Sequence, residues 1–310
     1  MSAAPAAAPP AGTPASRRRL AWARRRRALA GYARAYAANR GGMAGLAALL
    51  LIAAAALAAP LFVSPADLSL TDAAGGRFDP PGAGAPLGTD PYGRSVLDLV
   101  VWGARISLTV GFLAAFVSVA LGTLVGVIAG HYGGWAGNVL MRVTDWFAVL
   151  PALVMAVALA AVMTRSTLTI VIAIGVTAWP ATARVVRAQT LAVEARPFIE
   201  RARALGGGHA HVMLRHVLPN VMPVVLAQTT LLVAEAIMME ATLAFLGLGD
   251  PATVSWGGII QDARTAGAIS SGIWWYMVPP GVAIAAVSLA FTMCGRTLES
   301  VLNPRLRERQ

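Results

Sequence analysis

The sequence contains no lysine and a single cysteine, and each absence excludes a class of function. All 25 Lys+Arg positions are arginines. A phosphate-binding P-loop uses a lysine to reach the nucleotide phosphates, so this chain carries no ATPase of that type. Cys294 alone cannot form an intramolecular disulfide or a multi-thiolate metal site. If ATP drives this protein, the ATP binds elsewhere.

Charged residues are also scarce. They make up 13% of the 310 residues, whereas hydrophobic residues make up 57%. A soluble globular domain has about 25% charged residues, so the composition indicates a membrane protein. The net charge is +11, and nine arginines lie between Arg17 and Arg40, before the first apolar run. Basic residues in that position are typical of a cytoplasmic flank against the lipid bilayer, and we expect no nucleic-acid partner.

Six apolar segments have the length that a bilayer requires. The fold class predicted is an all-α integral membrane protein with six transmembrane helices and both termini in the cytoplasm. Arginines gather on the segments that this topology places inside, as the positive-inside rule requires. The predicted spans cover residues 43–63, 105–130, 145–163, 168–190, 221–246 and 278–294.

The segments between the spans complete the predicted organisation. Residues 1–42 form a disordered, basic cytoplasmic segment, and within it residues 17–40 are either a helix on the membrane surface or an unstructured anchor. Residues 43–63 are the first transmembrane helix. Residues 64–104 are an extracytoplasmic loop with a turn at Asp90-Pro91, followed by a short amphipathic helix from Gly93 that leads into the bilayer. Residues 105–298 form a five-helix core, in which 131–142 is a short loop and 191–220 is cytoplasmic. Residues 299–310 are a cytoplasmic tail.

Three glycines recur every four residues within the second predicted span. Gly122, Gly126 and Gly130 share one face of a helix, and small residues at this spacing let two backbones approach closely. The pattern favours helix packing over a hinge.

A polar, glycine-broken stretch between the fourth and fifth spans organises the chain. Residues 198–205 are helix-forming, and Gly206 to Gly208 should end that helix because successive glycines are costly inside one. A second helix is predicted over residues 209–217, ending at Leu218-Pro219, since the residue before proline is pushed out of the α region. The stretch therefore predicts a helix–turn–helix that projects from the bilayer.

These residues resemble a known motif. Glu200-Arg201-Ala202, followed by Gly206 and by Leu218-Pro219, is similar to the EAA loop of ABC importer membrane subunits, from which Arg201 departs. Three further stretches resemble the C-type membrane subunit of dipeptide and oligopeptide ABC importers: LGTDPYGRSVLDLVVWGARISL, ATLAFLGLGDPATVSWGGIIQDAR and the tail LNPRLRER. The likeness runs from about Gly88 to the C-terminus.

The resemblance implies a permease of the type I importer kind in a bacterial inner membrane, carrying di- or oligopeptides and not itself an enzyme. Its expected partners are a second homologous permease, two ATPase subunits that hold ATP-Mg, and an extracytoplasmic substrate-binding protein. It implies no cofactor in this subunit. The residues expected to couple it to the ATPases are Glu200, Ala202, Leu205, Gly206, Leu218 and Pro219.

Three acids lie in or beside the spans, where ionisable groups are costly and face a cavity or a partner. Glu240 fits the resembling motif, whereas Glu235 lies outside it. Each is a candidate for the translocation path or for a structural ion pair, with Arg105 as the expected partner of Glu240. Asp145 is expected to pair locally with Arg142.

Other interpretations are less consistent with the residues. His209, His211 and His216 are close in sequence, but positions 209 and 211 point apart on a helix and Arg215 repels a cation, so no metal site is predicted. Nickel or another small solute is the alternative substrate within the same family. A proton-coupled secondary transporter using Glu235 and Glu240 is the rival from another class, and it lacks the expected internal repeats.

Overall fold

The computed structural model describes residues 30–64, 66–71, 73 and 75–302. The predictions of a disordered start, and those for the tail beyond residue 302, lie outside the described residues. So do most of the arginines between Arg17 and Arg40. Residues 30–37 are helical and lead into the first long helix after a short break.

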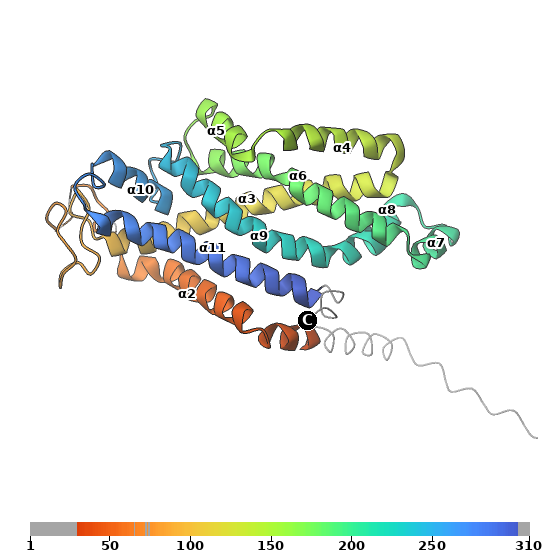
Figure 1. The fold of residues 1–310 in the computed structure, drawn as a ribbon, viewed down its shortest axis with the longest axis horizontal. Coiled ribbons are helices and arrows are strands. Elements are labelled where there is room, and N and C mark those ends of the chain that lie inside the picture. Colours follow the sequence, from red (N-terminus) through yellow and green to blue (C-terminus); the bar gives the residue numbers. More distant parts are fainter. Residues whose placement is uncertain (1–29, 65, 72, 74, 303–310) are drawn as a thin grey trace, which may run out of the picture.

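The described chain is a long bundle of helices, with no strand among the described residues (Figure 1). The helices in chain order are α2 (Arg40–Phe62), α3 (Val96–Tyr132), α4 (Gly134–Val149), α5 (Ala152–Val162), α6 (Thr167–Glu194), α7 (Pro197–Ala204), α8 (His209–Val212), the π-helical turn η1 (Met213–Val217), α9 (Leu218–Phe245), α10 (Trp256–Thr265) and α11 (Trp274–Leu302).

Five of the described helical stretches are long and apolar enough to cross a membrane: α2, α3, α6, α11 and the continuous stretch from His209 to Phe245. The third predicted span, residues 145–163, is not one straight helix. It is the pair α4 and α5, whose axes meet at 82°. Six spans are therefore present only if the bent pair is counted as one.

The prediction of one helix over residues 145–163 and a loop over 131–142 was wrong. Pro151 has no backbone N–H, and Leu150 before it is extended (φ −82°, ψ 135°), so the helix ends there and α5 begins anew. The expected loop is helical except at Gly133, which has a φ of +56° and separates α3 from α4.

The centre of the bundle is the pair α3 and α6, which pack on each other more extensively than any other two described helices. The glycine stripe lies in this contact. A Cβ atom at Gly122 would stand 2.8 Å from the Trp179 carbonyl oxygen, and one at Gly126 would stand 2.6 Å from that of Ala183. The packing interpretation of the stripe is confirmed, because no larger side chain fits between these backbones.

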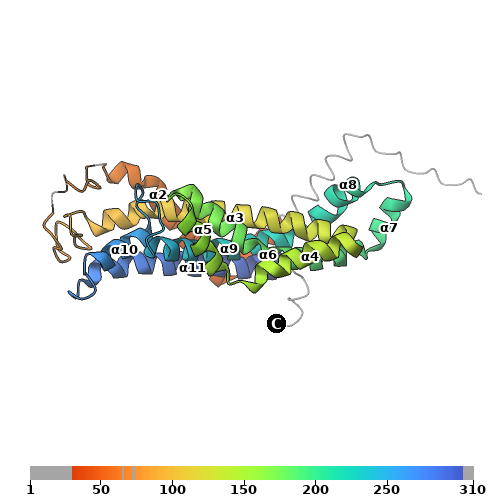
Figure 2. The same ribbon diagram turned by 90° about the horizontal axis from the view of Figure 1, so that it is seen from above.

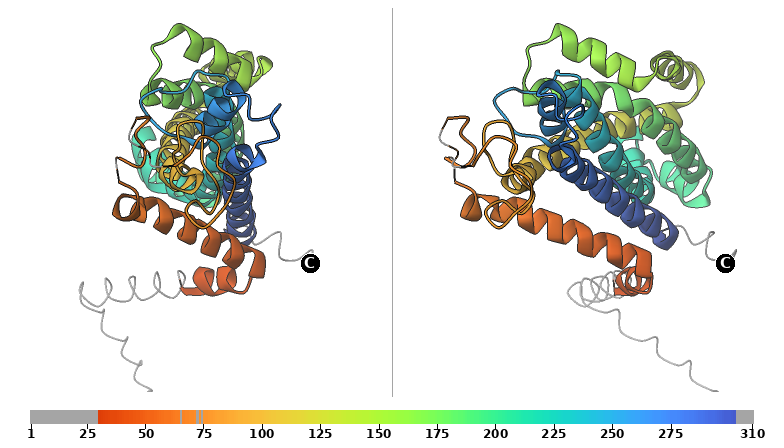
Figure 3. Two further views of the ribbon diagram at one scale, coloured as in Figure 1. Left: turned by 90° about the vertical axis from the view of Figure 1, so that its left-hand side faces the viewer. Right: turned by 60° about the vertical axis from the view of Figure 1, so that its left-hand side comes forward.

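The remaining long helices surround this pair. Helix α2 lies against α11 and α3 on one side of the bundle, while α4 and α5 lie on the other side (Figure 3). The start of α2 and the end of α11 point toward the same end of the molecule as α7 (Figures 1 and 2). We call this the α7 end, and the opposite end, with residues 75–95 and α10, the α10 end.

The α10 end contains one helix that the sequence did not lead us to expect. Helix α10 forms inside the segment assigned to an outer loop, and the Ser255 side chain caps it by accepting a hydrogen bond from the Gly258 amide. A serine followed by an amphipathic run is the sequence pattern that could have predicted this helix. At the same end, the short helix predicted from Gly93 is the first part of α3, which begins at Val96 with Ser95 as its N-cap and runs without a break into the span.

Candidate functional site

Helix α7 projects from the bundle at the α7 end (Figure 2). Pro197 is its first residue and Glu200 lies in its first turn, which suits the positive end of a helix dipole. Ile199 is fully buried and is the one buried residue of α7, while Glu200 and Arg201 are exposed and Ala202 is half-buried. The helix is thus anchored on one face, while Glu200 and Arg201 lie on its exposed side.

The turn after α7 ends the helix as predicted. Gly206 has a φ of +86°, its amide donates to the Arg203 carbonyl oxygen, and the Gly207 amide donates to that of Ala202, both at 2.9 Å. This pair of hydrogen bonds is a Schellman motif, which needs a left-handed residue that glycine adopts without strain. Leu205, at the tip, is 89% exposed.

A hollow of about 510 Å³ lies between α7 and the following helical turn. Leu205, Ala202 and Phe198 line one side, and His211 and His216 line the other. The rings of the two histidines lie 5.5 Å apart. The predicted site residues Ala202, Leu205 and Gly206 are therefore brought together at one exposed, apolar-rimmed surface, with Glu200 on the same short helix.

Leu218 and Pro219 do not belong to that surface, and the predicted end of the helix at this dipeptide was wrong. The chain continues from α8 through the π-helical turn η1 into α9, with Leu218 donating to the Met213 carbonyl oxygen five residues back. The wider turn accommodates the missing amide of Pro219, and the Asn220 side chain donates to the His216 carbonyl oxygen at 2.7 Å.

Glu240 is enclosed by three helices. It is 3% exposed, and it accepts a hydrogen bond from the Ser107 hydroxyl at 3.0 Å. The same hydroxyl accepts from the Trp256 amide at 3.2 Å, so the group links α9 to α3 and α10. The expected pair with Arg105 is absent: that guanidinium stacks on the Trp102 ring, 4.7 Å from its centroid. Glu240 is a buried joint between helices.

Glu235 differs from Glu240 although it lies little more than one turn away on α9. Its side chain is exposed. Gln228 lies two turns earlier on the same side of α9 and lines a cavity of about 960 Å³ between α6, α9 and α11. Leu231, one turn from Glu235, lines this cavity too. Of the two acids, Glu235 is the one that another molecule can reach.

Asp145 forms an ion pair, but not the local one predicted. Its carboxylate accepts from Arg184 of α6 at 2.8 Å, with both side chains about half exposed. The pair thus joins α4 to α6 rather than Asp145 to Arg142. The sequence separation of the two partners explains why a local rule missed it.

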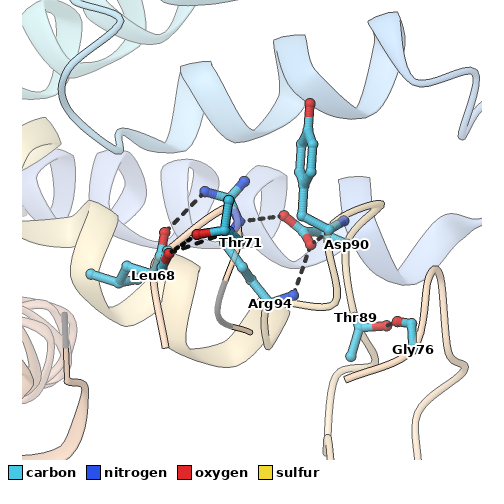
Figure 4. Close-up of polar contacts among 8 residues, drawn as sticks. Leu68, Thr71, Gly76, Thr89, Asp90 and Arg94 are labelled. Carbon is cyan, nitrogen blue, oxygen red and sulfur yellow. Dashed lines mark hydrogen bonds and ion pairs between the residues drawn. The ribbon is translucent and has the colours of Figure 1, made fainter. Parts of the chain in front are cut away.

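The α10 end contains a buried ion pair that sequence reasoning also missed (Figure 4). The Arg94 guanidinium donates to Asp90 at 2.6 Å, and the Asp90 side chain is 0% exposed. Asp90 also accepts from the Tyr92 and Arg94 amides at 2.9 Å, which forms the predicted turn. Nearby, burial raises the pKa of Asp262 on α10, an effect that Arg94 partly opposes. A cavity of about 900 Å³ opens beside these groups.

Residues 122–308 match the family model of the binding-protein-dependent transport system inner membrane component. This match takes in α4 to α11, and with them the projecting helix and Glu240. The chain belongs to this family. It is accordingly a multi-pass protein of the bacterial inner membrane and a permease subunit of an ABC importer.

Relatives match this permease over most of its length. The dipeptide transport system permease protein DppC of Bacillus subtilis strain 168 is 36% identical over 87% of this chain and 83% of the relative. The di/tripeptide permease DppC of Pseudomonas aeruginosa strain UCBPP-PA14 is 36% identical over 88% and 90%. The glutathione permease GsiD of Pectobacterium atrosepticum is 33% identical over 71% and 73%.

A solved structure shares the fold. The inward-facing methionine ABC transporter MetNI has a chain that aligns with a TM-score of 0.51 over 64% of this permease and 96% of that chain, at 18% identity. A second crystal form gives a TM-score of 0.50. The predicted importer-permease fold is therefore confirmed.

Proposed function

We propose that this permease forms half of the translocation path of an ATP-driven importer for di- and oligopeptides. Its relatives in Bacillus subtilis and Pseudomonas aeruginosa are named for dipeptides and tripeptides, and the glutathione permease of Pectobacterium atrosepticum is named for a tripeptide. This agreement in substrate class supports short peptides over nickel. A second permease would complete the path, and a substrate-binding protein would deliver the peptide.

The projecting α7 is the proposed docking element for an ATPase subunit, and its exposure is the observation that carries the proposal. A leucine that is 89% exposed at the tip of a projecting turn has no partner in the chain's described part. Apolar side chains of this kind act as anchors when they enter a partner's pocket. The ATP and its magnesium would bind in that partner, because this chain has no lysine for a P-loop.

The proposed topology places the α7 end in the cytoplasm and the α10 end outside. Arginines on and around α7 support this orientation, since positive charge is retained inside. The start of α2 and the end of α11 would then lie on the cytoplasmic side, and the α10 end would face the substrate-binding protein.

Glu235 is the proposed acid of the translocation path. A carboxylate that stays exposed on a spanning helix is costly against lipid, so its face must meet water, a partner or the solute. Gln228 and the cavity between α6, α9 and α11 continue the same polar side of α9. Glu240 is too enclosed by Ser107 and Trp256 to serve.

Replacing Leu205 tests the docking proposal. Leu205→Glu should weaken ATPase binding by about 10–100-fold, because it puts a charge where an apolar anchor enters a pocket. Leu205→Met is the matched control, since it keeps an apolar side chain of similar volume. The measurement is recovery of the ATPase with the tagged, purified transporter. Full recovery with Leu205→Glu would remove α7 as the docking element.

A further inference from the structure

Glu194 is the last residue of α6, where a carboxylate is out of place. The C-terminal end of a helix carries the negative end of its dipole, so an acid there is unfavourable unless a cation compensates it. The side chain is 11% exposed, so water compensates it poorly. A specific set of partners must therefore account for its position.

Two elements supply those partners. Arg203, in the last turn of α7, donates to Glu194 Oε2 at 2.6 Å. His131, in the last turn of α3, is hydrogen-bonded through Nδ1 to Glu194 Oε1. One carboxylate thus joins α6, α7 and α3, through charge-assisted hydrogen bonds of the stronger kind.

The network continues into the second half of the projecting segment. His131 Nε2 lies 3.0 Å from Nδ1 of His209, the first residue of α8. The two ring nitrogens form one hydrogen bond, in which one donates and the other accepts. The His131 side chain is fully buried, which holds the ring in this orientation. Both helices of the projecting segment are therefore tied to the end of α3.

We propose that Glu194 is a positioning residue that transmits the movement of α7 to the spans. The apolar attachment of α7 consists of buried Ile199 and half-buried Phe198 and Ala202, so it resists sliding weakly. The Glu194 carboxylate adds a directional link to α3 and α6, the most extensively packed pair in the bundle. A pull on α7 thereby reaches both helices. This inference rests on the proposed docking of an ATPase at α7.

Substitutions can separate transmission from docking. Glu194→Ala removes the carboxylate, and Arg203→Ala removes only its link to α7. Glu194→Asp keeps the charge on a shorter side chain, and Arg142→Ala is the control for loss of an exposed arginine on α4. Each variant is expressed with the partner permease, ATPases and binding protein, and reconstituted in proteoliposomes. Uptake per ATP hydrolysed, ATPase recovery and hydrogen exchange of residues 197–212 are measured.

Glu194→Ala should retain the ATPase, lower uptake per ATP by about tenfold and speed hydrogen exchange of residues 197–212 to a similar extent, since hydrogen bonds to a charged group are lost. Arg203→Ala should change both in the same direction but less, Glu194→Asp should recover part of the coupling, and Arg142→Ala should behave as wild type. Unchanged uptake per ATP and unchanged exchange in Glu194→Ala would overturn the proposal. So would loss of the ATPase itself, which would make Glu194 part of docking.

A charge exchange keeps the test decisive if Glu194→Ala does not accumulate. The double variant Glu194→Arg with Arg203→Glu retains one acid and one base at the same two positions. It should couple better than Glu194→Arg alone, and no improvement would count against the link. Failure of the docking proposal gives a different result. The ATPase would then be recovered in full with the Leu205→Glu variant, independently of the results for the Glu194 variants.

Discussion

The two ends of the molecule are held by different means. At the α10 end, an ion pair is buried and its carboxylate accepts three hydrogen bonds from Tyr92 and Arg94. Trp256, the first residue of α10, is 1% exposed and donates its indole N–H to the Val100 carbonyl oxygen. At the α7 end, Arg203 is 47% exposed, and the side-chain hydrogen bonds that hold α7 converge on the Glu194 carboxylate. The α10 end is held by buried, paired groups, whereas the projecting α7 is attached to the bundle at few points.

This difference fits the work proposed for each end. A surface that receives a binding protein keeps its shape best if its polar groups are buried and paired. A segment that follows the movement of an ATPase must move without unfolding the spans. Few, mostly exposed contacts lower the free-energy cost of displacing it. The few contacts that remain, at Glu194 and Ile199, then determine which helices of the bundle follow the movement of α7.

The largest effect should come from breaking the buried pair. Asp90→Ala leaves Arg94 without its buried counter-charge, and we expect a loss of about 3–5 kcal/mol in the free energy of unfolding. Asp145→Ala is the control, because its ion pair with Arg184 is about half exposed and such pairs contribute about 0–1 kcal/mol. Denaturant titration in detergent micelles measures both. Equal losses would mean that the buried pair holds the α10 end no more firmly than an exposed pair holds α4 to α6.

A middle-sized effect is expected between the ends, at Glu235. Glu235→Gln removes the charge from the exposed face of α9, and uptake of a peptide with a free amino group should fall about tenfold, as when a charge-assisted hydrogen bond is lost. Unfolding free energy and ATPase recovery should not change, since the side chain is exposed. Uptake of the N-acetylated peptide is the control. If both peptides are affected equally, Glu235 does not bind the amino group.

The sequence predicted the elements that depend on local physics. Runs of apolar residues placed the long helices, the glycine spacing predicted the packing face of α3, and Gly206 marked the end of α7. The two prolines misled in opposite directions. Pro151 separates two helices in a segment whose apolar content predicted one continuous span. Pro219, where a helix end was predicted, lies in the first turn of α9 after a π-helical turn.

The partners of the charged groups could not be predicted from the sequence. Glu194 meets His131 across 63 residues and Asp145 meets Arg184 across 39, so no spacing rule connects them. Only the packing of α3, α4 and α6 brings these side chains together. For the same reason the exposure of Glu235 and the enclosure of Glu240, five residues apart, needed the structure.

The smallest effect is a pH dependence at the α10 end. Asp250 follows α9, and its carboxylate accepts from the Thr167 amide at 3.1 Å and from the Thr167 hydroxyl at 2.9 Å, at the start of α6. Partial burial by itself raises the pKa of Asp250, but hydrogen bonds from the Ala252 amide and from Thr167 outweigh it and lower the pKa.

Because the pKa of Asp250 is lower in the folded state, its stabilising contribution is complete above the unfolded value of about 3.9 and is lost as the pH falls through the folded value. Comparing unfolding midpoints at neutral and acidic pH should therefore show a smaller acid sensitivity in Asp250→Asn than in the wild type. The difference should be under about 1 kcal/mol, because solvent screens the group. Thr167→Val should reduce the acid sensitivity in part, since it removes a donor but no titrating group. Wild-type acid sensitivity in both variants would show that this contact does not help to hold the α10 end.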